Sequence, residues 1–177
     1  NEGPGTNTIT SVVSDGSVSV TNSFTVVVTE VNVAPVFVGT PGNRTISEQT
    51  LLTVTNAATD GDLPANALSY SLVNAPGNAG ISSVGVITWT PGEAQGPGTN
   101  TITTVVSDGL VSVTNSFEVT VQEVNVVPVF AGTPTNRVIN ELTLLTVTNN
   151  ATDSDVPANV LTYSLVQGPT GMAINAG

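Results

Sequence analysis

Residues 96–121 read GPGTNTITTVVSDGLVSVTNSFEVTV, and residues 3–28 read GPGTNTITSVVSDGSVSVTNSFTVVV. In both stretches an Asp-Gly pair separates two segments in which apolar and small polar residues alternate, a pattern that predicts two β-strands joined by a turn. The two copies lie 93 residues apart, and sliding residues 94–177 over residues 1–84 gives 57 identities in 84 positions. The chain is therefore a tandem repeat with a 93-residue period.

The sequences VNVAP at residues 31–35 and VNVVP at residues 124–128 mark the ends of repeats. Counted from these points, residues 1–33 are the C-terminal part of one repeat, 34–126 a complete β-sandwich repeat, and 127–177 the N-terminal part of the next. Two interpretations of the incomplete parts stay open. Either the chain samples a longer array, or its two incomplete ends complement each other between neighbouring chains.

The fold class predicted for the repeat is all-β. Short alternating segments bounded by Pro and Gly predict six or seven strands in two antiparallel sheets. We expect Trp89, Tyr70 and Phe117 in the core, and no stretch has helical periodicity over three turns. The clearest strands are expected at residues 51–55, 68–73, 86–89, 99–106 and 110–121.

Composition excludes several classes of protein. The chain has 13 acidic residues against 2 arginines, no lysine and no histidine, and a formal charge of −11. A nucleic-acid binder needs basic residues to neutralise phosphates, and an anionic membrane surface would repel this chain. No apolar run is long enough to insert in a membrane. Without His, Cys or Lys the chain lacks the common bases and nucleophiles, so we expect no catalytic residue and no enzyme activity.

The acidic residues recur with the repeat. Asp60-Gly61-Asp62, followed by Asn66, places two carboxylates and an amide oxygen in one short loop, which suits a hard cation such as Ca²⁺. Turn formation is the alternative, since Asp and Asn also favour turns without any metal, and Asp15-Gly16 could be a hairpin turn only. The acidic residues paired at the 93-residue spacing are Asp15 with Asp108, Glu30 with Glu123, Glu48 with Glu141, Asp60 with Asp153, and Asp62 with Asp155.

The order of these motifs resembles a known family. ATDGDLPANALSYSL at residues 58–72, then GVITWTP, SDG and a closing EVNVAP, is similar to the cadherin-like, dystroglycan-type and putative-Ig repeats of large bacterial surface proteins. The resemblance implies tandem Ig-like or cadherin-like β-sandwich repeats joined end to end, with calcium at each junction. The metal ligands that it implies are Asp15, Glu48, Asp60, Asp62, Asn66, Asp108, Glu141, Asp153, Asp155 and Asn159.

The junction departs from the family pattern, which is rich in Asp and Asn. Thr29, Val31 and Val33 stand where the family has polar ligands. Asn32 remains, with a shifted Glu30, and their counterparts are Asn125 and Glu123. We therefore expect at most one calcium site per junction, and a junction without any cation stays open as an alternative.

A feature that recurs every 93 residues suits a joint or spacer better than an active site. The expected function is an extracellular structural rod or filament, located outside a bacterial cell or on its surface. The expected partners are neighbouring repeats of the same protein and other copies of the chain in a filament. Two other classes stay open: an adhesin module that binds glycan or protein, and a glycoside-acting enzyme that uses two carboxylates.

Overall fold

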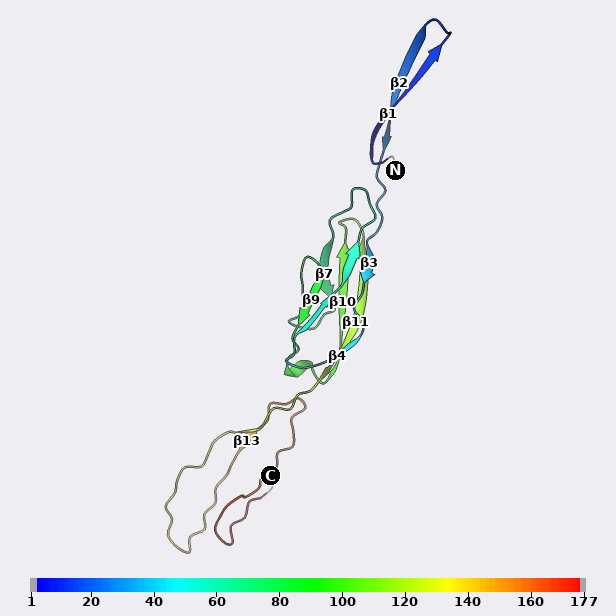
Figure 1. The fold of residues 1–177 in the computed structure, drawn as a ribbon. Helices are drawn as coiled ribbons and strands as arrows, with labels where there is room; N and C mark the ends of the chain where they lie inside the picture. Colours follow the sequence, from blue (N-terminus) through cyan, green and yellow to red (C-terminus); the bar gives the residue numbers. More distant parts are fainter. Residues whose placement is uncertain (1–2, 176–177) are drawn as a thin grey trace.

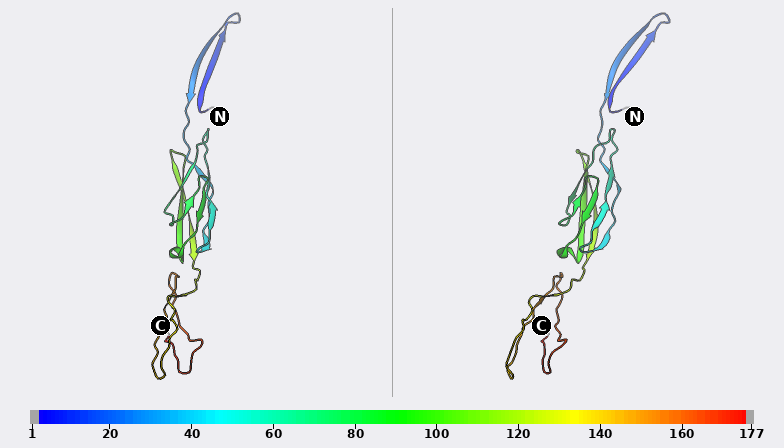
Figure 2. Two further views of the ribbon diagram at one scale, coloured as in Figure 1. Left: turned by 90° about the vertical axis from the view of Figure 1, so that its left-hand side faces the viewer. Right: turned by 60° about the vertical axis from the view of Figure 1, so that its left-hand side comes forward.

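The computed structural model describes residues 3–175. An N-terminal ribbon lies at one end, a closed β-sandwich in the middle, and a C-terminal segment with little regular structure at the other end (Figure 1). Two further views keep the same order along one elongated line (Figure 2). The architecture is all-β, which confirms the predicted fold class, with a single 3-10 turn, η1 (Glu93–Gln95), among the described residues.

The first sheet of the sandwich has four strands in the order β4-β11-β10-β7. β10 (Gly98–Ser107) and β11 (Ser112–Gln122) form the predicted hairpin, and β7 (Ser69–Val73) pairs antiparallel with β10. β4 (Arg44–Ser47) pairs with β11 in parallel, so the expectation of two purely antiparallel sheets is wrong. The reason is that the first part of the repeat changes sheets without reversing direction and reaches the edge beside the last strand.

The second layer contains two small groups of strands. β5 (Leu52–Thr55), β9 (Val86–Trp89) and β8 (Gly80–Ile81) pair antiparallel, with β9 in the centre. The strand β6 (Ala57–Thr59) follows β5 after the single residue Asn56 and pairs with β3 (Val36–Gly39). All pairings of these strands stay within residues 36–122.

The core lies between the two layers. Trp89 and Phe117 are buried there, as expected from the sequence, and the Trp89 indole N–H donates a hydrogen bond to the Gly77 carbonyl over 3.2 Å. Tyr70 is only half-buried, and its hydroxyl accepts a hydrogen bond from the Ala58 N–H over 3.1 Å. The other buried core residues are Leu52, Val54, Ile87, Ile102, Val119 and Val121.

The ribbon and the C-terminal segment repeat parts of the sandwich. β1 (Gly5–Ser14) and β2 (Ser19–Val28) pair in the register of β10 and β11, displaced by 93 residues. In the C-terminal segment, β12 (Val129–Phe130) pairs with β13 (Ala151–Thr152) as β3 pairs with β6. Over residues 3–175 we find no helix that is both long and apolar enough to cross a membrane.

Candidate functional site

Acidic side chains gather at the two places where the sandwich meets its neighbours. We call residues 29–35, between ribbon and sandwich, the N-terminal joint, and residues 122–128, between sandwich and C-terminal segment, the C-terminal joint. Because the repeat has a 93-residue period, the two joints occupy equivalent positions in the sequence. The residues around them that the chain contains differ between the two joints.

Three glutamates meet on the sandwich side of the C-terminal joint. Glu48, Glu93 and Glu123 each offer a carboxylate oxygen, and these oxygens lie within 4.8 Å of one another. The parallel β4–β11 pair explains part of this arrangement, since Glu48 follows β4 and donates its N–H to the Gln122 carbonyl over 2.9 Å. Glu93 arrives separately, as the first residue of η1. We call these three residues the glutamate cluster.

Two oxygens of the glutamate cluster are buried without a hydrogen-bond donor. Glu48 is 1% exposed; its Oε1 accepts a hydrogen bond from the Val124 N–H over 2.9 Å, while its Oε2 has no partner. Glu123 Oε1 is likewise buried and unpartnered. Leaving a carboxylate oxygen buried without a donor is costly. A bound cation is one way to satisfy such oxygens, and the three carboxylates lie close enough together to share one, so the residues present fit a metal site.

Negative charges lie close together at the glutamate cluster. Burial raises the pKa of Glu123 above its ordinary value, and the negative charges of Asp155 and Glu48 raise it further. Glu30 is the counterpart of Glu123 at the N-terminal joint. Burial raises its pKa in the same way, with a second contribution from the negative charge of Asp62. Both shifts mean that the folded structure disfavours the ionised carboxylate as it stands.

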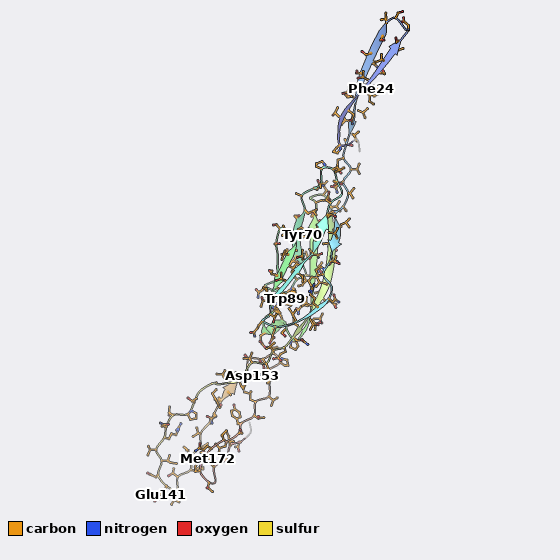
Figure 3. The ribbon with its side chains drawn as sticks, in the orientation of Figure 1. Phe24, Tyr70, Trp89, Glu141, Asp153 and Met172 are labelled. Atoms are coloured by element: carbon orange, nitrogen blue, oxygen red, sulfur yellow. The ribbon has the colours of Figure 1, made fainter. Side chains whose placement is uncertain are left out.

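Polar side chains hold the far side of the C-terminal joint. Asp155 Oδ1 accepts a hydrogen bond from the Val126 N–H over 2.9 Å, and Asp153 Oδ1 accepts one from the Asp155 N–H over 3.0 Å. The Asn159 amide donates to Asn125 over 2.9 Å and to Asp155 over 2.7 Å. Asp153 accordingly lies next to the joint in Figure 3.

Direct contact also crosses this joint. Glu93 Oε1 accepts a hydrogen bond from the Val156 N–H over 3.2 Å. Glu93 belongs to the sandwich and Val156 to the C-terminal segment, so one carboxylate group touches both sides. Carboxylates from the sandwich and from the C-terminal segment therefore come together at the C-terminal joint.

At the N-terminal joint, Asp60, Asp62 and Asn66 make the same contacts as Asp153, Asp155 and Asn159 make at the C-terminal joint. Asp62 accepts the Val33 N–H over 2.9 Å, and Asp60 Oδ1 accepts the Asp62 N–H over 3.0 Å. The Asn66 amide donates to Asn32 over 3.0 Å and to Asp62 over 3.1 Å. Asp60 Oδ2 is buried without a partner, as two glutamate oxygens are at the other joint.

Asp108 adds a further carboxylate at the N-terminal joint. Its Oδ2 accepts a hydrogen bond from the Asn32 amide over 2.9 Å, which brings it to the linker. Its Oδ1 accepts hydrogen bonds from the Val111 and Leu110 N–H groups over 2.6 and 2.7 Å. The bond from Val111, followed by that from Asn32, lowers the pKa of Asp108. Asp108 therefore closes a turn with one carboxylate oxygen and contacts the N-terminal joint with the other.

Two of the candidate residues lie apart from the joints. Asp15 closes the turn of the ribbon, where its Oδ1 accepts the Ser17 and Val18 N–H groups, both over 2.9 Å. The Val18 bond, then the Ser17 bond, lowers the pKa of Asp15. Glu141 is exposed at the far end of the C-terminal segment (Figure 3). The joints bring together the other candidates: Glu30, Asn32, Glu48, Asp60, Asp62, Asn66, Asp108, Glu123, Asn125, Asp153, Asp155 and Asn159.

Sequence reasoning missed Glu93. Its counterparts one period away fall outside the chain, so the recurrence that singled out the other acids could not find it. The available signal was its place in TPGE, residues 90–93, where the resembling repeats carry a Leu-Asp-Arg-Glu segment that also ends in Glu.

Comparison with known proteins gives partial likenesses. The sequence matches no protein-family model and no curated protein. Similar solved structures include EC1-3 of mouse protocadherin-24 (19% identity, TM-score 0.46, covering 94% of this chain and 61% of that one). They also include extracellular cadherin domains 1-5 of protocadherin gamma B2 (20%, 0.48, 85% and 32%) and an endo-fucoidan hydrolase of glycoside hydrolase family 107 (23%, 0.41, 68% and 19%). The chain thus spans less than two thirds of each of these proteins.

Proposed function

We propose that this chain is part of an extracellular structural rod, at a bacterial surface, whose tandem β-sandwich repeats are held in line by Ca²⁺ at the joints. The supporting observation is the glutamate cluster with its two buried, unpartnered oxygens at the point where the sandwich meets its neighbour. A rod of this kind needs a stiffening element at every joint, and the acids recur at that interval.

The chemistry of the joint suits calcium in particular. Ca²⁺ takes six to eight oxygen ligands in flexible geometry, whereas Mg²⁺ requires a small octahedron and keeps several waters. The ion would supply two positive charges to a joint that has no lysine. Because the ligands come from both sides and from the linker, binding would oppose bending. The residues that would hold it are Glu48, Glu93, Glu123, Asn125, Asp153 and Asp155.

Catalysis by the same carboxylates is a poorer explanation. Their spacing is close to the ~5 Å separation of retaining glycosidases. Glu48, however, is only 1% exposed, and one of its oxygens is engaged by the Val124 N–H. A sugar substrate could not reach it without opening the joint, so the arrangement favours a structural role.

The decisive experiment measures bending at the C-terminal joint. The chain has no native cysteine, so Val84→Cys with Val160→Cys, both at exposed positions, places one spin label on each side. We expect pulsed electron paramagnetic resonance to show a narrower distance distribution with millimolar Ca²⁺ than with a chelator.

A matched pair within the sandwich, Val84→Cys with Val38→Cys, controls for effects of calcium on the label, since both side chains are exposed and, among the described residues, neither position hydrogen-bonds to an acidic residue of the joints. Its distance distribution should not respond to calcium. If the pair that spans the joint responds no more than this control, calcium does not stiffen the joint and the proposed mechanism is wrong.

A further inference from the structure

One member of the glutamate cluster lacks the support that paired strands give the other two. Glu123 directly follows β11, and Glu48 directly follows β4, which pairs with β11. Glu93 is instead the first residue of η1, a single turn at the end of the sandwich next to the C-terminal joint (Figure 1). A single turn has little stability of its own. Two other carboxylates within 4.8 Å also repel Glu93, so its place at the cluster needs a further support.

The chain that leads into η1 is fastened at Pro91 and open at Gly92. The Gln49 N–H donates a hydrogen bond to the Pro91 carbonyl over 2.7 Å, which ties this point to the segment that carries Glu48. Gly92 is exposed, and a Cβ added there would meet nothing within 4 Å. Side-chain packing therefore does not hold the backbone directly before Glu93.

The side chain of Gln95 holds this stretch of backbone from both ends of its amide. Its Oε1 accepts a hydrogen bond from the Gly92 N–H over 2.9 Å. Its Nε2 donates to the carbonyl of Gly77, in the loop between β7 and β8, over 3.0 Å. Gln95 thus binds the residue before Glu93 and ties the whole turn to a different loop of the sandwich.

The groups to which Gln95 is tied are themselves held by the sandwich. The Gly77 carbonyl also accepts the indole N–H of Trp89, a core residue that is 1% exposed. The main-chain carbonyl of Gln95 accepts a hydrogen bond over 3.0 Å from the amide of Asn100, in β10. The core and the first sheet therefore fix the orientation of η1 through this one residue.

We propose that Gln95 is a positioning residue for the calcium site at the C-terminal joint, holding Glu93 at the glutamate cluster before the ion binds. This inference rests on the proposed function. A ligand that is already held in its binding geometry loses less conformational freedom when the ion arrives. Gln95 itself is not a ligand and acts through Glu93, as outer partners of metal ligands do.

The first test is the calcium affinity of a Gln95→Met chain, because methionine keeps the length of the side chain and removes both of its hydrogen bonds. Calcium is titrated into the folded 177-residue chain, and the amide resonances of Val124 and Val126 report on this joint. We expect a dissociation constant at least tenfold higher than that of the unsubstituted chain. The control is Gln122→Met, the same change on an exposed side chain of β11, and it should bind calcium like the unsubstituted chain.

The second test needs no metal. Glu93 Oε1 accepts the Val156 N–H, and Glu48 Oε1 accepts the Val124 N–H. In chelator, Gln95→Met should move the Val156 amide proton resonance upfield, since its acceptor has left, and should leave that of Val124 in place. A residue with a purely structural role would lower the unfolding temperature without changing either the affinity of the folded chain or this one resonance.

Equal dissociation constants for the Gln95→Met and Gln122→Met chains would overturn the proposal, as would an unmoved Val156 resonance in the Gln95→Met chain. An unsubstituted chain that binds no calcium would instead overturn the proposed function. The resonances in chelator would then still show whether Gln95 holds Glu93 in place, so the two failures are distinguishable.

Discussion

Replacing Glu48 with Gln tests the proposed calcium site at the C-terminal joint with a small change in shape. The glutamine Oε1 can still accept the Val124 N–H, so the hydrogen bond to the linker is kept. The unpartnered Oε2 becomes an amide that cannot bind a cation, and one negative charge leaves the glutamate cluster. The variant therefore separates cation binding from packing.

The size of the effect follows from the class of site. Extracellular calcium modules bind with dissociation constants of about 10⁻⁴ to 10⁻³ M. At ~10 mM Ca²⁺, binding to the folded state alone stabilises it by about 1.4 to 2.7 kcal/mol. For a repeat of this length that is a rise in unfolding temperature of about 6 to 20 °C. Loss of a direct ligand costs affinity at least tenfold, which lowers the calcium stabilisation of Glu48→Gln by about 1 kcal/mol or more.

Thermal unfolding followed by circular dichroism, in calcium and in chelator, measures both chains. The control is Glu118→Gln, which makes the same charge change on an exposed residue of β11, away from the glutamate cluster. Glu118→Gln should keep the full calcium shift. An unsubstituted chain with no calcium shift, or a Glu48→Gln chain with an undiminished one, would refute the reasoning.

Two further predictions concern the pH dependence of stability without calcium and the packing around Gly85. Because the pKa of Glu123 is raised above 4.5, its ionisation opposes folding; because that of Asp108 lies below 3.8, its ionisation favours folding. The unfolding temperature in chelator should rise as the pH falls from 7 toward 4.5 and should fall below pH 3.8, whereas a steady decline from pH 7 would contradict the assignment. Gly85→Ala should destabilise the sandwich by about 2 to 4 kcal/mol in urea unfolding, through its positive φ and the clash of the added Cβ with the Asn56 carbonyl oxygen and with the Tyr70 ring. Gly92→Ala, at an open position with φ −94°, should have little effect, and equal losses would show that the clash is not the cause.

Much of the fold could be predicted from the sequence, because strands with one buried face alternate visibly. Residues 86–89 form β9 as expected, and the predicted segments at 99–106 and 110–121 differ from β10 and β11 by a residue or two. β4 was not predicted, because four residues at the edge of a sheet carry too few alternations to be recognised. The parallel pairing of β4 with β11 depends on the path of the chain through the whole repeat, and a local sequence pattern does not predict that path.

The candidate site was predictable to the extent that its residues recur. Asp60, Asp62 and Asn66 were recognised as one loop, and the structure ties them to Asn32. The meeting of Glu93 with residues 48 and 123 could not be seen in the sequence. It arises from a tertiary arrangement of a turn and two strand ends, with no short-range spacing to signal it.

The parallel edge of the first sheet has a mechanical consequence. In the proposed rod, tension would enter the sandwich through β3, ahead of β4, and leave it after β11, so β4 and β11 would be pulled in opposite directions along their length. Their four paired positions, from Arg44 with Val119 to Ser47 with Gln122, are then sheared together, whereas a hairpin pulled at its open ends unzips one pair at a time. In the proposed rod, the edge that brings Glu48 beside the C-terminal joint would thus also act as a shear clamp, and a cation bound there would reinforce the repeat where the pulling force is applied.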